Sequence, residues 1–169
     1  MFAAHEPSDI ERFFRGLTEY AFHSRLGVVD PPLVDYVALL LVRFLRHDAL
    51  TPPPSGDAGP PDVARRLVAA RTHEAQHEAQ EALAEYRHIG DATLFWSGLY
   101  PEAVARRQPG RPEHLLDFRE AGRRAYWLAS TLEPDDAAEE RLLFERLSHD
   151  YDLCVEGLGE VRRAWGDAA

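Results

Sequence analysis

The chain has 169 residues, of which 45% are hydrophobic and 28% are charged, values that are ordinary for one globular domain. Its formal net charge is −10, and all nineteen basic residues are arginine. The absence of lysine excludes lysine Schiff-base chemistry and the phosphate-binding P-loop, and the acidic balance predicts no nucleic-acid partner.

Membrane insertion and secretion are not indicated by the pattern of apolar residues. The longest apolar run extends from Tyr36 to Val42 and ends at Arg43. That is far short of the roughly 20 residues that a membrane span needs. The first twelve residues also lack the basic and then apolar layout of a secretory signal. We therefore expect a cytoplasmic protein without a membrane partner.

Two helices are predicted before the first long loop. Ser8 and Glu11 form a capping box, which predicts a helix from there to about Gly27, a residue suited to ending it. Asp30-Pro31 is typical of a second helix start, and this helix extends from Pro31 to about His47. The second helix is apolar almost all round, so we expect it at the centre of the fold.

A proline-rich surface loop, residues 51–61, separates these helices from the rest of the chain. A long, polar third helix is predicted from about Asp62 to Ile89. Gly90 suits its C-terminus, and Asp91 can cap a short fourth helix from Ala92 to about Leu99.

The last third of the chain predicts two more helices. The fifth extends from about Pro112 to Leu132, and the sixth opens at Pro134. The sixth carries an apolar stripe at steps of three and four residues: Leu143, Leu147, Tyr151, Cys154, Leu158, Val161 and Trp165. No segment alternates as a strand would. The fold class is therefore all-α, with residues 1–169 forming a single-domain bundle of about six helices and an ordered core at about 8–166.

The most specific chemical motif is H-E-x-x-H, formed by His73, Glu74 and His77. On one helix, two histidines four residues apart can hold a zinc ion, while the glutamate acts as general base on the bound water. The surrounding side chains are polar, and the third ligand of extended metalloprotease motifs is missing. Glu81 is the candidate third ligand in that case. The pattern leaves open a zinc or iron site, including a di-metal enzyme, or a solvated helix face.

The stretch from His88 to Asp91 has two interpretations. The two side chains could form a catalytic pair, or His88 could favour a helix C-terminus while Asp91 caps the next helix. A group of aromatic residues nearby is either core or an anchor for a partner. Its members are Phe95, Trp96, Tyr100, Tyr126 and Trp127.

Two stretches resemble a family of uncharacterised bacterial all-helical proteins. Residues 86–101 follow that family's G-D-x-x-L-F-x-x-G-x-x-P pattern, and residues 117–129 follow its D-x-x-x-x-G-x-x-x-Y-x-x-A helix. The resemblance implies a bacterial, all-helical protein and brings no activity with it. The H-E-x-x-H motif lies outside the matching region.

The sequence as a whole favours a non-enzymatic protein that acts through protein–protein interaction, with another protein or in a homo-oligomer, and needs no cofactor. The alternative is a metal-binding protein or a metal-dependent hydrolase that uses the helix carrying His73, Glu74 and His77.

Overall fold

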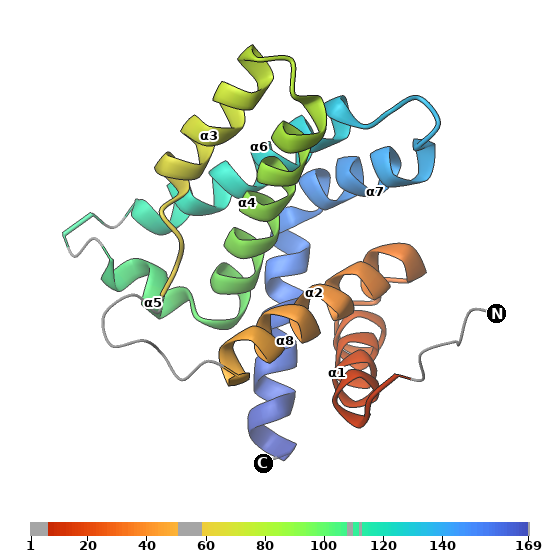
Figure 1. Cartoon of the computed structure of the whole chain (residues 1–169). Helices are drawn as coiled ribbons and strands as arrows, with labels where there is room; N and C mark the ends of the chain where they lie inside the picture. Colours follow the sequence, from red (N-terminus) through yellow and green to blue (C-terminus); the bar gives the residue numbers. More distant parts are fainter. Residues whose placement is uncertain (1–6, 51–58, 108–109, 112, 169) are drawn as a thin grey trace.

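The computed structural model of the protein describes residues 7–50, 59–107, 110–111 and 113–168, and within them it is all-helical, as predicted (Figure 1). Most of the predicted proline-rich loop, residues 51–58, lies outside the described residues. The described ranges contain eight α-helices and one π-helical segment rather than about six helices: α1 Asp9–Glu19, η1 Tyr20–Arg25, α2 Pro31–Leu50, α3 Val63–Ala75, α4 Ala79–Leu99, α5 Pro101–Arg106, α6 His114–Leu132, α7 Ala138–His149 and α8 Tyr151–Ala168. Over these described residues, no helix has the length and apolar character needed to cross a membrane.

The predicted start of the first helix is confirmed. The Ser8 hydroxyl accepts a hydrogen bond from the backbone N–H of Glu11, and the Glu11 carboxylate accepts one from the backbone N–H of Ser8. The helix continues past α1 as the π-helical turn η1, and Gly27 follows with a positive φ of 68°. A glycine at this position lets the chain turn toward α2 without steric cost.

The predicted third helix is wrong as one continuous element. The chain leaves α3 after Ala75, turns at His77 with a φ of 58°, and begins α4 at Ala79. A straight helix from Asp62 to Leu99 would be roughly 57 Å long. Folding back instead lets α3 pack along α4, with Ala70 and Ala82 both fully buried. No glycine or proline stands at the turn, so the tertiary packing determines it.

The predicted helix end at Gly90 and Asp91 is also wrong. Both residues lie in the middle of α4, which continues to Leu99. Asp91 is therefore not an N-cap, and the separate helix from Ala92 is the second half of α4. Gly90 has a different reason for being glycine, because a Cβ there would lie 2.6 Å from the ring of Tyr126 on α6.

The predicted sixth helix divides at Asp150 into α7 and α8, which point in different directions in Figure 1. The predicted stripe still faces the core: its five members from Leu147 to Val161 are fully buried, and Leu143 and Trp165 are partly buried. A straight helix from Pro134 to Gly166 would be roughly 50 Å long, whereas a compact chain of this size is roughly 40 Å across. The bend lets α7 pack on α6 while α8 packs on α4 and η1.

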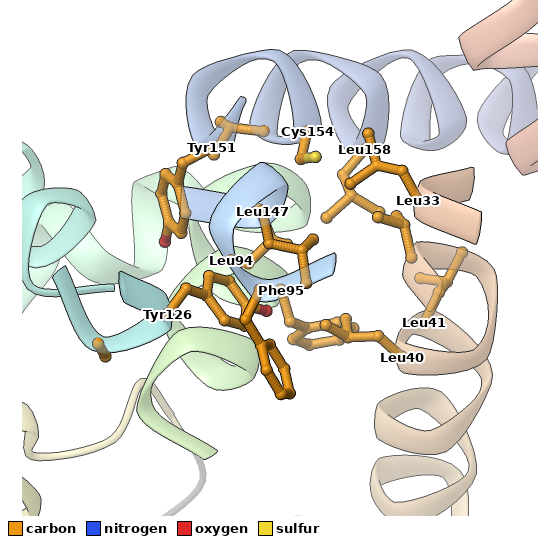
Figure 2. Packing of buried hydrophobic residues seen from close by; sticks show 14 of the residues in the cluster. Leu33, Leu40, Leu41, Leu94, Phe95, Tyr126, Leu147, Tyr151, Cys154 and Leu158 are labelled. Atoms are coloured by element: carbon orange, nitrogen blue, oxygen red, sulfur yellow. The ribbon is translucent and has the colours of Figure 1, made fainter. Parts of the chain in front are cut away.

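The central helix is α4 rather than α2, which corrects the expected central position of the second helix. Helix α4 packs against α2, α3, α5, α6 and α8, and its residues from Ile89 to Phe95 are all buried. Helix α2 buries Leu33, Leu40 and Leu41 but leaves Leu39 51% exposed. Figure 2 shows these α2 leucines meeting Leu94 and Phe95 of α4, with Leu147 of α7 and Cys154 and Leu158 of α8.

Helices α4 and α6 cross closely at Gly122. A Cβ added to Gly122 would lie 1.9 Å from the Thr93 hydroxyl oxygen and 2.5 Å from the Tyr151 hydroxyl oxygen. The Tyr151 hydroxyl donates to Thr93, whose own hydroxyl donates to the carbonyl of Ile89. The crossing distance therefore depends on the missing side chain.

We expect Gly122→Ala to destabilise the protein by about 3 kcal/mol, because the methyl group overlaps Thr93 and Tyr151 in a packed interior. Gly159→Ala is the matched control within a helix, since a Cβ at Gly159 meets nothing closer than 3.9 Å. That control should be neutral or stabilising by up to about 1 kcal/mol through helix propensity. Urea unfolding followed by circular dichroism measures both, and equal effects of the two substitutions would contradict this account of the crossing.

Candidate functional site

The H-E-x-x-H residues do not share one helix face. His73 and Glu74 are in the last turn of α3, whereas His77 is in the turn that follows. The Glu74 carboxylate accepts a hydrogen bond from the Tyr86 hydroxyl at 2.6 Å, and the His73 ring contacts the carboxylate of Glu78. The geometry on which the zinc hypothesis depended, two histidines four apart on a continuous helix, is therefore wrong.

The predicted third ligand, Glu81, is exposed on the first turn of α4. No group of three or more His, Cys, Asp and Glu side chains in the described part of the chain is arranged so that it could hold a metal ion. The metal-binding alternative stays a prediction without geometric support.

The predicted aromatic group divides between core and surface. Phe95 and Tyr126 are fully buried, and Trp96 and Tyr100 pack against the core while partly exposed. Phe95 stacks on Phe44 of α2 with ring centroids 4.9 Å apart. Trp127, by contrast, is 53% exposed. Of the predicted aromatic residues, only Trp127 is an exposed residue.

The most unusual group in the core is the carboxylate of Asp91, in the middle of α4. The hydroxyls of Tyr36 on α2 and Tyr126 on α6 both donate to its Oδ1 at 2.7 Å. Arg43 on α2 donates to its Oδ2 at 2.8 Å, and Arg87 lies 3.8 Å from the same oxygen. Asp91 is only 3% exposed, so these partners replace the water that an ionised carboxylate needs.

Burial governs the titration of this cluster. It raises the pKa of Asp91 above the ordinary aspartate value, and the two tyrosine hydrogen bonds and the charges of Arg43 and Arg87 oppose that rise. Burial, with the nearby Asp91 charge, also raises the pKa values of Tyr36 and Tyr126. Both phenols therefore remain protonated donors at any physiological pH.

A cleft of about 420 Å³ opens above this buried carboxylate, between α2 and α4. Its lining residues are Arg43, Phe44, Ala84, Arg87, His88 and Asp91. The spacing of the last four places them on one face of α4, because residues three and four apart are neighbours on a helix. The volume is within the range of small-molecule binding sites.

Each of the two arginines has one hydrogen bond to a neighbouring side chain, and the rest of its guanidinium group has no acceptor in the described part of the chain. Each side chain is about half exposed, 50% for Arg43 and 43% for Arg87. Arg43 donates from one terminal nitrogen to Asp91, and Arg87 donates from Nε to the Tyr36 hydroxyl at 3.2 Å. The other N–H groups of both guanidinium groups have no acceptor among the residues that the structure describes. An arginine carries five N–H donors, so most of this capacity is available in the cleft.

His88 forms the side of the cleft. Its ring packs against Phe44, with centroids 6.4 Å apart and planes 27° from parallel. Burial lowers the pKa of His88, the charge of Arg66 adds to this, and the carboxylates of Asp91 and Glu85 oppose it. Arg66 is itself paired with Glu85 at 3.2 Å. His88 is therefore neutral at pH 7, and the cleft carries two positive charges against the single negative charge of Asp91.

Sequence reasoning found part of this site and missed the rest. His88, Asp91 and Tyr126 were singled out, whereas Arg43 and Arg87 were not. A continuous α4 places Arg87 one turn before Asp91, so a correct prediction of this helix would have indicated the pair. Nothing in the sequence alone indicates that Arg43 of α2 meets them.

Removing the buried carboxylate of Asp91 should lower the stability of the protein more than removing an exposed carboxylate does. We expect Asp91→Ala to lower the free energy of unfolding by about 3 kcal/mol, since it leaves two tyrosine hydroxyls and a guanidinium without their acceptor. The value is at the lower end for a buried pair because Arg43 is half exposed. Asp117→Ala, at an exposed position of α6, is the control. A loss from Asp91→Ala no larger than that of the control in urea unfolding would contradict this role.

His88 should make stability depend on pH. Because its folded pKa lies below the ordinary 6.5, the unfolded chain takes up the proton first as the pH falls through 6.5. Stability is then lost until the pH passes below the folded pKa. We expect the wild-type protein to lose more stability than His88→Gln between about pH 7.5 and 5. Urea unfolding across this range measures the difference, and equal losses of stability in the two proteins would contradict this role of His88.

No protein-family model, curated protein or solved structure matches this chain. The resemblance to a bacterial helical family therefore stays a prediction that rests on residues 86–101 and 117–129. These residues lie mainly on α4 and α6, the helices that cross at Gly90 and Gly122.

Proposed function

We propose that the protein is a non-enzymatic binding protein whose cleft between α2 and α4 takes a small molecule through an anionic group, a carboxylate or a phosphate. The observation that carries the proposal is the pair of half-exposed guanidinium groups of Arg43 and Arg87 above the buried Asp91. A guanidinium group can bind a carboxylate or a phosphate through two parallel hydrogen bonds. These bonds are stronger than neutral ones because donor and acceptor are charged.

The buried carboxylate supports this proposal by orienting the arginines. Asp91 accepts from Arg43, and Arg87 is held against the ring of Tyr36, with its guanidinium carbon 5.6 Å from the ring centroid. Groups held in place before binding lose less conformational entropy when a ligand arrives. Two arginines and one aspartate line the cleft, and this balance favours an anion.

The rest of the lining favours a ligand with an apolar part next to the anion. Phe44 and the ring of His88 form one side of the cleft, and Ala84 adds a small apolar surface. A binding site of this kind typically combines apolar walls with a few charged groups that fix orientation. The ligand class is thus a small anion that carries a ring or a short apolar chain.

Phenyl phosphate and benzoate are suitable probes, with benzyl alcohol as an uncharged control of similar size. We expect the two anions, and not the alcohol, to raise the melting temperature and to give a saturable isotherm in calorimetry. Arg87→Gln should weaken anion binding by about tenfold to a hundredfold, because a charge-assisted hydrogen bond is lost. This variant should still fold, since Arg87 is too far from Asp91 to hydrogen-bond to it.

Arg65→Gln, an exposed arginine of α3, is the matched control and should bind the anions as the wild-type protein does. Binding of benzyl alcohol equal to that of the anions, or anion binding that survives Arg87→Gln, would overturn the proposal.

A second candidate function, interaction with another protein, has separate support. Trp127 on α6 is a large aromatic residue that is 53% exposed to solvent. Tryptophan is enriched among the residues that contribute most to protein interfaces. This residue was predicted as a possible anchor, and its position outside the core is what that role requires.

A further inference from the structure

A second cleft lies where α6, α7 and α8 meet, away from the residues that surround Asp91. It has a volume of about 430 Å³. Its lining comes from all three helices: Arg123, Trp127, Glu145, Ser148, His149 and Asp152. Nothing in the proposed anion-binding site uses these side chains.

Two helices place Trp127 and Glu145 in this cleft. Trp127 follows the buried Tyr126 on α6, and because consecutive helical residues point about 100° apart, it faces outward. Glu145 follows the buried Phe144 on α7 in the same way. Ser148, one turn further on, donates to the Arg123 carbonyl and ties α7 to α6 beside the cleft. The indole and the carboxylate are therefore presented on packed helices rather than on loops.

Glu145 is a partly buried carboxylate without a cationic partner in the described chain. Arg141 stands four residues earlier on α7, yet the two side chains form no ion pair. The cation in the cleft, Arg123, is already shared by the carboxylates of Glu120 and Asp152. Two carboxylates, of Glu145 and Asp152, thus line the cleft with one arginine, next to an exposed indole ring.

We infer that this cleft binds an arginine side chain of a partner protein, with the guanidinium group on the Trp127 ring and paired with Glu145. The inference rests on the second candidate function above and names the chemistry of the partner. A planar guanidinium can stack on an aromatic face while its edge donates to a carboxylate, which an ammonium group does less well. A chain with net charge −10 also attracts a basic partner and repels a second copy of itself.

The indole N–H signals of the three tryptophans give a direct readout in ¹⁵N-correlated spectra, with Trp127→Phe assigning the relevant one. The probe is acetyl-Gly-Ser-Arg-Ser-Gly-amide, and the matched peptide carries citrulline, which has the shape of arginine without its charge. We expect the arginine peptide to shift the Trp127 signal with saturation and to leave those of Trp96 and Trp165 in place. The citrulline peptide should bind at least about fivefold more weakly.

Glu145→Gln should weaken binding of the arginine peptide by at least about fivefold, whereas Glu139→Gln, at an exposed position of α7, should not. An absent shift, an equal response to citrulline, or full binding by Glu145→Gln would each overturn the inference. Sedimentation equilibrium separates this failure from that of the candidate function. A dimer that dissociates on Trp127→Ala would show that the surface binds a second copy, which keeps protein interaction and overturns the arginine partner.

Discussion

The carboxylate of Asp91 joins three helices through hydrogen bonds in a core that is mostly apolar. Tyr36 of α2 and Tyr126 of α6 meet at one oxygen, and Arg43 of α2 holds the other. A charge buried without these donors would destabilise the fold by several kcal/mol. The positions of α2 and α6 around α4 are therefore constrained by these hydrogen bonds as well as by packing. Hydrogen bonds depend on angle as well as distance, so they restrict the helix orientations more than apolar packing does.

The same constraint determines what the cleft presents to a ligand. A free arginine side chain on a helix samples many rotamers, whereas Arg43 is fixed by Asp91 and Arg87 by the Tyr36 hydroxyl and ring. The buried acid thus serves stability and orientation together. It also limits the charge of the cleft, because without Asp91 the two guanidinium groups would repel each other across the gap between α2 and α4.

Helical periodicity predicted the fold class and the buried stripe in the last third of the chain, but not the breaks after Ala75 and at Asp150. The stripe from Leu143 to Trp165 faces the core on both sides of Asp150, because burial depends on residue spacing and survives a bend. The breaks follow from the size of the core, and the local sequence around each break does not indicate that size. At Gly90 a helix end was predicted where the helix in fact continues. A glycine before an aspartate has the same local signature at a helix end and at a close helix crossing.

Residue spacing along one helix related His88 to Asp91, but it could not relate either residue to the other helices of the site. His88 and Asp91 stood out as a pair, yet their partners come from α2 and α6, 48 to 55 residues before Asp91 and 35 after it. Tyr126 and Trp127 show how one contact affects both faces of α6. Because Tyr126 is tied to Asp91, the rotation of α6 about its axis is fixed, and the next residue must point away from the core. The exposure of Trp127 is therefore a consequence of the buried carboxylate, so the network that orients the arginines of one cleft also presents the indole of the other.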